Sequence, residues 1–491
     1  MAYSISKNNV GFALGPLLYF LILFLFKPVD LGAEGVAVFA ATVWIAIWWI
    51  SEAVPIEATA LLPIVLFPLG GGPSLQETCA AYAHKFIFLF MGGFILAIAI
   101  EKWNLHKRIA LTIINKVGTN LVMVILGFML STAFLSMWIS NTATAVMMLP
   151  IGMALIAQTK NGPKESEESY KGFGRALMLA IAYSASIGGM ATLIGTPPNL
   201  ILAGVIQETY GIELSFAKWF MFGLPISIIL LFVCWKYLTR FAFPMKKLQF
   251  PGGKSAIRTQ LKELGSMSFE EKMVLVVFIV TAFLWISRSL ILTNIFPALD
   301  DTIIAIFSAL VLFVLPSSKK KTRLINWNDA MKLPWGVLIL FGGGIALAVG
   351  FQSSGLAVWI AHQLTSMSGL NIFLLILILV AAVNFLTEIT SNLATASVLL
   401  PILAPLALAM DVHPFGLMVA CTLAASCAFM LPVATPPNAI VFGSGVVPIS
   451  AMIRTGIWLN IISIAVITIF VYSMLPLLWG FEISSFPDFL K

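Results

Sequence analysis

One polar phrase occurs twice in this otherwise apolar chain. Residues 140–145 read Ser-Asn-Thr-Ala-Thr-Ala, and residues 391–396, 251 positions later, read Ser-Asn-Leu-Ala-Thr-Ala. Each copy runs into Leu-Pro-Ile, and each is followed further along by Thr-Pro-Pro-Asn, at 196–199 and at 435–438. Such residues break helices, and broken backbone in apolar surroundings is tolerated only where protein or a water-filled cavity lines it. The duplication therefore predicts one polar site built jointly by two related halves.

The composition identifies the environment of that site. Hydrophobic residues make up 60% of the 491 residues and charged residues 10%, with a mean hydropathy of +1.01, whereas a soluble chain is about a quarter charged. The sequence therefore predicts an all-α polytopic membrane protein with room for on the order of ten to twelve spans of ~20 residues. The net charge of +7 reflects membrane topology and does not indicate nucleic-acid binding, because Lys and Arg collect in cytoplasmic loops.

Eleven apolar segments are candidate transmembrane spans. They are residues 11–26, 35–51, 55–70, 87–101, 175–206, 218–239, 273–292, 302–316, 335–350, 416–442 and 457–480. Two further apolar regions, 121–157 and 372–408, carry the Ser-Asn phrase near their middles. Each arm of these regions has about 15 residues, which is short for a hydrocarbon core of ~30 Å. We expect two re-entrant hairpins that turn at Ser-Asn and leave on the side they entered.

The charged loops predict the orientation of the chain. A cytoplasmic N-terminus places the basic loops inside; these lie at 102–116, 160–175, 240–262 and 319–332. Four acidic residues then fall outside: Glu208, Glu213, Asp300 and Asp301. This is the positive-inside pattern. We expect a multi-pass protein of the inner or plasma membrane with its N-terminus in the cytoplasm.

The two halves carry opposite flanking charge. Residues 89–93 (Leu-Phe-Met-Gly-Gly) align with 340–344 (Leu-Phe-Gly-Gly-Gly) at the offset of the Ser-Asn phrases. Four basic residues follow the first copy within 102–116, whereas 352–367 contains none. Similar sequence with opposite flanking charge indicates opposite orientation in the membrane. The pattern predicts an inverted repeat, whose shared site lies near the bilayer midplane, as in secondary transporters.

The residue types of the repeated phrases suit both cations and anions. Ser and Asn side chains and the freed carbonyl groups of a broken membrane helix are oxygen ligands for alkali cations. Thr hydroxyl and Asn amide groups can hold a carboxylate, and a half-helix that begins at Pro points its positive end at an anion. Neither phrase contains Lys or Arg. A multivalent anion would therefore need bound cations to offset its charge, which favours cation coupling.

The small polar residues and the nearby acidic residues also allow structural interpretations. Ser, Thr and Ala near Gly and Pro also serve tight helix packing in membranes, but the duplication of both phrases disfavours packing alone. Glu388, just before the second tip, either supports that hairpin or contributes to a cation site. Glu52 and Glu57 flank a kinked turn between spans and are more typical of structural residues than of substrate ligands.

Enzymatic chemistry finds no support in the sequence. The chain has no Walker A phrase, no H-E-x-x-H and no nucleophile elbow. The four cysteines and four histidines have no spacing typical of a metal site. We expect a transporter, not an enzyme, with no organic cofactor.

The chain resembles the divalent anion–sodium symporter family, which transports dicarboxylates and citrate. The resemblance rests on the two Ser-Asn phrases, the two Thr-Pro-Pro-Asn phrases and Glu-Ala-Val-Pro at 52–55 with Ala-Leu-Leu-Pro at 60–63. It implies eleven spans plus two re-entrant hairpins in a homodimer, in which a transport domain slides like an elevator along a fixed scaffold domain. The implied division is scaffold 1–120, transport 121–245, cytoplasmic linker 246–272, scaffold 273–370 and transport 371–491.

The resemblance also implies roles for individual residues. The first sodium site would use Ser136, Ser140, Asn141 and the carbonyl region at Gly195. The second would use Thr387, Thr390, Asn392 and the region at Ala434. The substrate carboxylates would meet the tips and the broken helices at Asn141, Thr142, Asn392, Leu393, Thr196, Pro197, Thr435 and Pro436. Leu393 stands where many bacterial members have Thr, and it cannot donate a hydrogen bond, so substrate preference is left open there.

Together these observations predict a sodium-coupled symporter that imports C4-dicarboxylates such as succinate, malate and fumarate. The nearest alternative is a sodium-independent dicarboxylate/2-oxoglutarate exchanger on the same fold. A sulfate carrier, an anion channel and an integral membrane enzyme are further alternatives. The sequence favours symport because both tips keep Ser-Asn and no Lys or Arg stands in for a cation.

Overall fold

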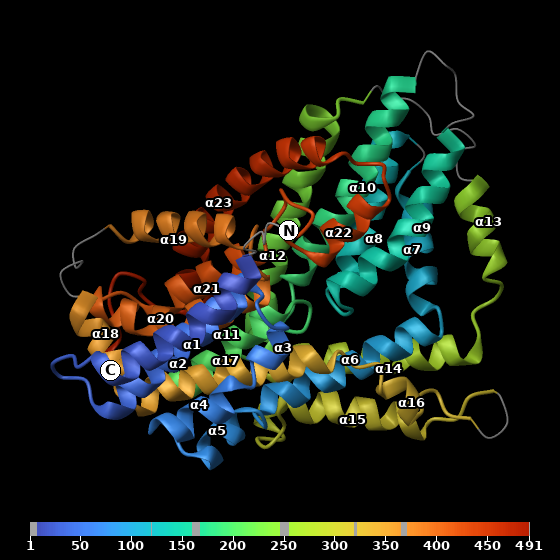
Figure 1. The fold of residues 1–491 in the computed structure, drawn as a ribbon. Coiled ribbons are helices and arrows are strands. Elements are labelled where there is room, and N and C mark those ends of the chain that lie inside the picture. Colours follow the sequence, from blue (N-terminus) through green and yellow to red (C-terminus); the bar gives the residue numbers. More distant parts are fainter. Residues whose placement is uncertain are drawn as a thin grey trace, which may run out of the picture.

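The described chain folds into α-helices that pack against one another (Figure 1). The computed structural model describes residues 7–118, 120–159, 167–245, 255–318, 322–364 and 371–490. Within these ranges no strand forms beyond one isolated bridge between Pro316 and Arg323. Seven helices of the described chain are long and apolar enough to cross a membrane, and shorter apolar helices accompany them. The prediction of an all-helical membrane protein is confirmed.

The first half of the chain ends in a short π-helix. Its elements are α1 (Lys7–Leu25), α2 (Ala33–Ser51), α3 (Ile56–Thr59), α4 (Leu62–Gly70), α5 (Leu75–Ala81), α6 (Lys85–Lys102), α7 (Leu105–Val117), α8 (Leu121–Ser136), α9 (Asn141–Thr159), α10 (Glu167–Gly189), α11 (Pro197–Tyr210), α12 (Phe216–Lys236) and the π-helix η2 (Tyr237–Ala242).

The second half has the longest helix at its end. Its elements are α13 (Ser255–Glu263), α14 (Phe269–Arg288), η3 (Leu292–Asn294), α15 (Asp301–Val314), α16 (Trp327–Ala330), α17 (Trp335–Ser353), α18 (Leu356–Leu364), α19 (Ile372–Leu386), α20 (Asn392–Ala409), α21 (Pro414–Ala425), α22 (Pro436–Gly443), α23 (Ile449–Trp479) and η5 (Asp488–Leu490). Of the expected linker 246–272, residues 246–254 lie outside the described part, and α13 and the start of α14 form within the rest.

The helices break where the polar phrases predict. The region 121–157 forms α8 and α9 with a turn at 137–140, and 372–408 forms α19 and α20 with a turn at 387–391. Both Thr-Pro-Pro-Asn phrases begin a helix, with Thr196 and Thr435 in extended conformation as N-caps and Pro in the first turn. Pro is favoured there because the first-turn N–H groups have no partner within the helix.

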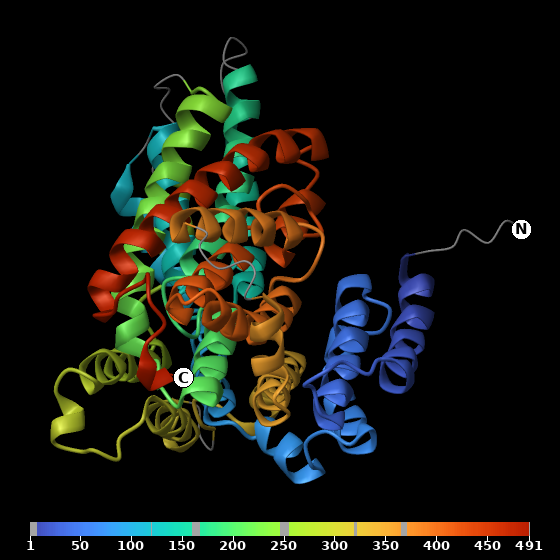
Figure 2. The same ribbon diagram turned by 90° about the vertical axis from the view of Figure 1, so that its left-hand side faces the viewer.

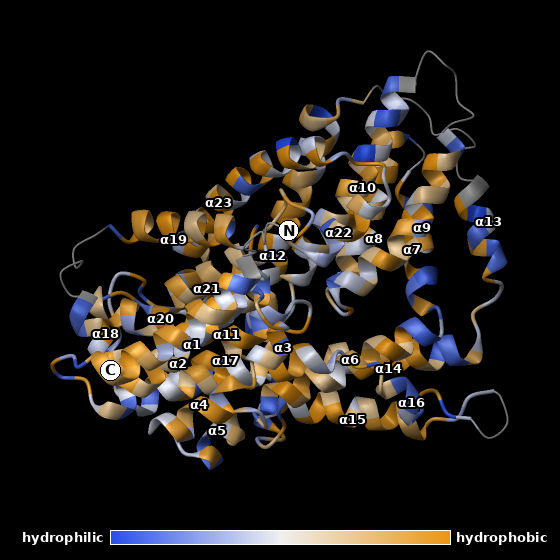
Figure 3. Cartoon of the chain, viewed as in Figure 1, coloured by the Kyte–Doolittle hydropathy of each residue, from blue (hydrophilic) through white to orange (hydrophobic). Residues whose placement is uncertain are grey.

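Apolar side chains cover much of the outer surface. Figure 3 shows long stretches of hydrophobic residues on the helices and hydrophilic residues gathered at helix ends and on α13. Helices α14 and α15 expose large side chains such as Ile279, Phe283, Phe307 and Leu310. Exposed apolar area of this extent needs a cover, and in a membrane lipid supplies it. Figure 2 shows α1 to α5 grouped at one side of the molecule.

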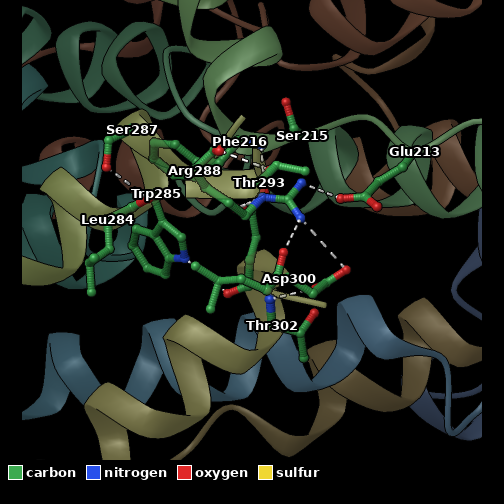
Figure 4. A network of polar contacts seen from close by, with 12 residues as sticks. Glu213, Ser215, Phe216, Leu284, Trp285, Ser287, Arg288, Thr293, Asp300 and Thr302 are labelled. Atoms are coloured by element: carbon green, nitrogen blue, oxygen red, sulfur yellow. Dashed lines mark hydrogen bonds and ion pairs between the residues drawn. The ribbon is translucent and has the colours of Figure 1, made fainter. Parts of the chain in front are cut away.

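A network of ion pairs ties the α11–α12 loop to three other helices (Figure 4). Arg288, at the end of α14, pairs with Glu213 of that loop and lies with its Nε 2.8 Å from Asp301 Oδ1. Lys85, at the start of α6, lies 3.2 Å from Glu213 and 2.9 Å from Asp300. Arg288 and Asp301 are buried, so removing one partner would leave an uncompensated buried charge.

Candidate functional site

The two repeated phrases, far apart in sequence, line one cavity. Its volume is about 780 Å³. Both Ser-Asn tips and both Thr-Pro-Pro-Asn phrases contribute to its wall: Ser140, Asn141, Thr142, Gly195, Thr196, Pro197, Ser391, Asn392, Leu393, Ala434, Thr435 and Pro436. The opposite wall comes from α3, α6 and α17 through Glu57, Phe90, Phe94, Gly336 and Leu340. The structure thus brings the predicted pocket residues of both halves together.

Four helices of the repeated phrases begin at this cavity. The first residues of α9, α11, α20 and α22 all lie in its lining. The N-terminus of a helix carries a partial positive charge and N–H groups without helical partners. Four such ends around one cavity favour an anion in it.

The first tip is a compact group of oxygen atoms. Ser136 Oγ, at the end of α8, lies 2.6 Å from the Asn141 amide and 2.7 Å from the carbonyl oxygen of Ala185 in α10. Ser140 Oγ accepts a hydrogen bond from Ala143 N at 3.2 Å and so caps α9. Ser136 is fully buried behind the cavity wall. The tip is therefore fixed to α10 through Ser136.

The second tip repeats this arrangement with different residues. Thr387 Oγ1 lies 2.8 Å from Asn392 Oδ1 and 3.0 Å from the carbonyl oxygen of Ala425 in α21. In both tips a hydroxyl side chain five residues before the Asn links the Asn amide to a carbonyl group of the broken helix. The two carbonyl groups, of Ala185 and Ala425, are not spaced by the offset of the tips, so the sequence alignment did not reveal them.

At the first tip, the Asn141 amide lies among oxygen atoms. Its nitrogen donates to the carbonyl oxygens of Ala185 and Gly195 at 3.1 and 3.3 Å and to Ser136 Oγ at 2.6 Å. Carbonyl and hydroxyl oxygens at a broken membrane helix are the ligands that alkali cations take. Glycine is required here, because a Cβ on Gly189 would lie 2.5 Å from the Asn141 amide. The donor set fits an alkali cation.

The Asn residues of the two Thr-Pro-Pro-Asn phrases hold the broken helices in shape. Asn199 Nδ2 donates to the carbonyl oxygen of Thr192 at 2.7 Å, and Asn438 Nδ2 donates to Leu431 at 3.0 Å and to Ala428 at 3.1 Å. Both Asn side chains are fully buried. Carbonyl groups freed by a break must be paired when they are buried. No role was predicted for these Asn residues, although each ends one of the two repeated Thr-Pro-Pro-Asn phrases.

Three residues that were predicted to bind sodium are not part of the described cavity lining. Ser136 and Thr387 connect the tips to the broken helices as described above. Thr390 is buried as well; its hydroxyl lies 2.9 Å from the carbonyl oxygen of Leu386 and 2.7 Å from Thr395 Oγ1. The hydroxyl of Thr390 thus already has partners within its own hairpin.

Glu388 supports the break between α21 and α22. Its buried carboxylate accepts hydrogen bonds from the backbone N–H groups of residues 429, 430 and 431 at 2.7, 2.8 and 2.9 Å. Asn460 Nδ2 of α23 donates a fourth at 2.7 Å. Four donors around a carboxylate satisfy most of its acceptor sites. From the sequence, Glu388 was expected either to support its hairpin or to contribute to a cation site. The contacts seen in the structure are structural ones, which join the hairpin to the α21–α22 break and to α23.

Two carboxylates lie on the wall opposite the tips. Glu52 ends α2 in the left-handed conformation (φ 50°), and Glu57 lies in α3 against Gly336. Both line the cavity, and the structural role expected for them at the inter-span turn stays a prediction. No Lys, Arg or His is present among the described lining residues. The side chains of the cavity wall therefore add negative charge and none that is positive.

Comparison with known proteins agrees with this architecture. A profile described as the sodium:sulfate symporter transmembrane region matches residues 7–480. A sodium-dependent dicarboxylate transporter of Staphylococcus saprophyticus, SdcS, is 50% identical over 499 residues, which covers 99% of this chain and 96% of the relative. SdcS of Staphylococcus aureus USA300 is 48% identical over 481 residues, with 97% and 92% covered.

Two solved transporter structures share the fold at low identity. MtrF of Neisseria gonorrhoeae, described among antimetabolite efflux pumps, has a TM-score of 0.59 at 14% identity, covering 94% of this chain and 95% of that one. The YdaH transporter of Alcanivorax borkumensis has a TM-score of 0.57 at 12% identity, covering 96% and 97%. At such identities the likeness concerns fold alone. The profile match and the close relatives show that this chain belongs to the divalent anion–sodium symporter family.

Proposed function

We propose that this protein is a sodium-coupled symporter that imports C4-dicarboxylates such as succinate, malate and fumarate across the inner or plasma membrane. The observation that carries the proposal is the shared cavity, where two hairpin tips and four helix N-termini converge. The names of the SdcS relatives, sodium-dependent dicarboxylate transporters, support it. A dicarboxylate is small enough for a cavity of about 780 Å³.

The charges in the cavity favour cation coupling. A dianion that enters a low-dielectric site needs compensating positive charge. The helix N-termini contribute partial charges only, and Glu52 and Glu57 act against the anion. Sodium ions bound at the tips would supply the missing charge. Binding of sodium first, followed by the dicarboxylate, is the order that this arrangement supports.

Each half would hold one sodium ion behind the substrate. The first would use Ser136, Ser140, Asn141 and Gly195, and the second Thr387, Thr390, Asn392 and Ala434. The substrate would contact the tips and the starts of α11 and α22 through Asn141, Thr142, Asn392, Leu393, Thr196, Pro197, Thr435 and Pro436. Support comes from the matching hydroxyl–amide–carbonyl groups at the two tips.

Transport would follow an elevator mechanism on an inverted repeat of eleven spans and two re-entrant hairpins. Residues 121–245 and 371–491 would form the moving domain and residues 1–120 and 273–370 the scaffold, in a homodimer with cytoplasmic N-termini. The cavity supports this division, because its tips and Thr-Pro-Pro-Asn phrases belong to the proposed moving part and α3, α6 and α17 to the proposed scaffold.

Uptake of labelled succinate into proteoliposomes tests the proposal. We expect accumulation under an inward sodium gradient, none with potassium in its place, and competition by malate and fumarate but not by sulfate. Uptake that ignores sodium and requires internal dicarboxylate would identify an exchanger instead. A conductance far above carrier turnover in planar bilayers would identify a channel.

A further inference from the structure

A second cavity lies away from the substrate cavity and shares no lining residue with it. Its volume is about 880 Å³. It is formed where α10, the π-helix η2 at the end of α12, and the start of α23 meet, and Figures 1 and 2 both show these ends side by side. Its wall includes Arg175 of α10 and Arg454 of α23, with Tyr237 and Phe241 of η2 and Trp458 of α23.

The two arginines give this cavity its charge. Among the described residues, neither Arg175 nor Arg454 has a carboxylate partner, and no Asp or Glu lines the cavity. Arg175 is half-buried and Arg454 is exposed. Guanidinium groups bind phosphate oxygens in a bidentate manner and are less strongly hydrated than ammonium groups. Two such groups around one hollow fit a phosphate.

The rim of the cavity is apolar and aromatic. Of its lining residues, Phe241 is 72% exposed and Trp458 56%. In a membrane protein, large apolar side chains with this exposure face lipid, and Trp and Tyr are typical of the interface between headgroups and acyl chains. A small soluble anion would contact the arginines but not the apolar rim, whereas a phospholipid has a charged headgroup and apolar chains that can contact both.

The backbone beside this cavity is a π-helix that is hydrogen-bonded to α23. A π-helix widens the last turn of α12, and such turns are frequent at functional sites. Tyr237 OH donates to the carbonyl oxygen of Thr455 at 3.1 Å and fixes η2 to α23. The basic residues Arg175 and Arg240 fall in the loops expected inside the cell, where the leaflet is rich in anionic lipid.

We propose that this cavity binds an anionic phospholipid, with its phosphate between Arg175 and Arg454 and its chains along Phe241 and Trp458. The lipid would connect α10 with α23, which come from opposite halves of the chain. The site is independent of the transported substrate, so it stands or falls separately from the symport proposal.

Native mass spectrometry of the delipidated protein, titrated with phosphatidylglycerol or with phosphatidylcholine of the same chains, tests the site. We expect one tight phosphatidylglycerol per chain. Arg175→Gln combined with Arg454→Gln should weaken it roughly ten- to thirtyfold, since each basic group near the surface is worth about a factor of five, and should leave phosphatidylcholine binding unchanged. Arg240→Gln, an exposed arginine of η2 outside the lining, is the matched control and should bind as the wild type.

A second variant separates the cavity from its charge. Ala451→Trp places a bulky side chain in the cavity but keeps both arginines, so it should weaken phosphatidylglycerol binding as well. Wild-type binding by the double arginine variant, or equal loss in Arg240→Gln, would overturn the proposal. Glycerol phosphate or succinate competing for the site as tightly as the lipid would show that the cavity takes a free anion, and would overturn it too.

Discussion

At the residue scale, the tips depend on single polar atoms. Each tip has one Asn whose amide lies beside a hydroxyl group, 2.6 Å away for Asn141 and 2.8 Å for Asn392. Thr142 and Leu393 occupy equivalent positions one residue later and both line the cavity, but Thr142 is exposed to it and Leu393 is only 8% exposed. The two tips therefore differ at an otherwise repeated position: the first presents the hydroxyl group of Thr142 and the second the aliphatic side chain of Leu393.

Replacing either tip Asn by Ala should abolish uptake. Asn141→Ala and Asn392→Ala each remove a group that faces both the cavity and the hydroxyl behind it, and one hydrogen bond to a charged group corresponds to roughly ten- to a hundredfold. The measurement is succinate uptake normalised to protein in the membrane. Asn294→Ala, on an exposed turn, is the control. Normal uptake by both tip variants would refute the assignment of the site.

Leu393→Thr should alter substrate preference. The new hydroxyl would add one hydrogen-bonding group at the wall, worth about 0.5–1.5 kcal/mol or roughly three- to tenfold in affinity. We expect a lower KM for succinate and a changed ranking of competing di- and tricarboxylates. An unchanged profile would make this position irrelevant to selectivity.

At the element scale, the two broken helices are stabilised by different means. Asn199 and Asn438 pair the carbonyl groups of the two breaks in the same way. Glu388 pairs the N–H groups of the second break only, because its counterpart in the first half is Met137. In the first half the side chain of Trp219 donates to the carbonyl oxygen of Met190, so it pairs a carbonyl group and no N–H group of the break. The second break therefore depends on one buried carboxylate.

Glu388→Gln should disturb sodium binding at the proposed second site more than substrate binding. Its amide NH2 would face backbone donors, so the break loses about 1–3 kcal/mol of support. We expect a lower melting temperature and a raised half-saturating sodium concentration, with little change in succinate KM at saturating sodium. Glu34→Gln, in the exposed first turn of α2, should match the wild type. An unaltered sodium dependence would show that the carboxylate does not act on the sodium site.

At the scale of the whole molecule, the α11–α12 loop is tied to helices of the proposed scaffold. Glu213 pairs with Arg288 (Figure 4) and with Lys85, and the N–H of Phe216 donates to Asp301 at 2.8 Å. An elevator motion of residues 121–245 past the scaffold must break these contacts in each cycle. The network would then stabilise the end state seen here.

Locking this contact should arrest transport. A Lys85→Cys/Glu213→Cys pair leaves the buried Arg288–Asp301 pair intact. It is made in a Cys79→Ser background because Cys79 is the exposed cysteine of the described chain, and a reducible bifunctional thiol reagent would join the loop to α6. We expect uptake to fall to background after cross-linking and to recover after reduction. Each single-cysteine variant is the control. Full uptake by the cross-linked protein would show that the loop and α6 move together.

Local signals were sufficient for much of the architecture. Apolar length predicts helices, and Pro and Ser-Asn predict where helices break, because both act within one or two turns of the chain. The helix starts at Pro197 and Pro436 and the turns at 137–140 and 387–391 follow from such signals. The repeat itself predicted that the four phrases share a cavity. The short helices α5, α7 and α18 were not predicted, because they are too short to show as apolar spans.

The sequence by itself determined the membrane environment, the positions of the helix breaks and the identity of the polar tips, since these depend on the composition and on neighbours along the chain. Only the tertiary structure decided which carbonyl groups the tips meet, that Glu52 and Glu57 face the cavity and that Glu388 holds the second break. These contacts join segments separated by tens or hundreds of residues. They arise when helices pack, and no local pattern specifies which buried donor will find which acceptor.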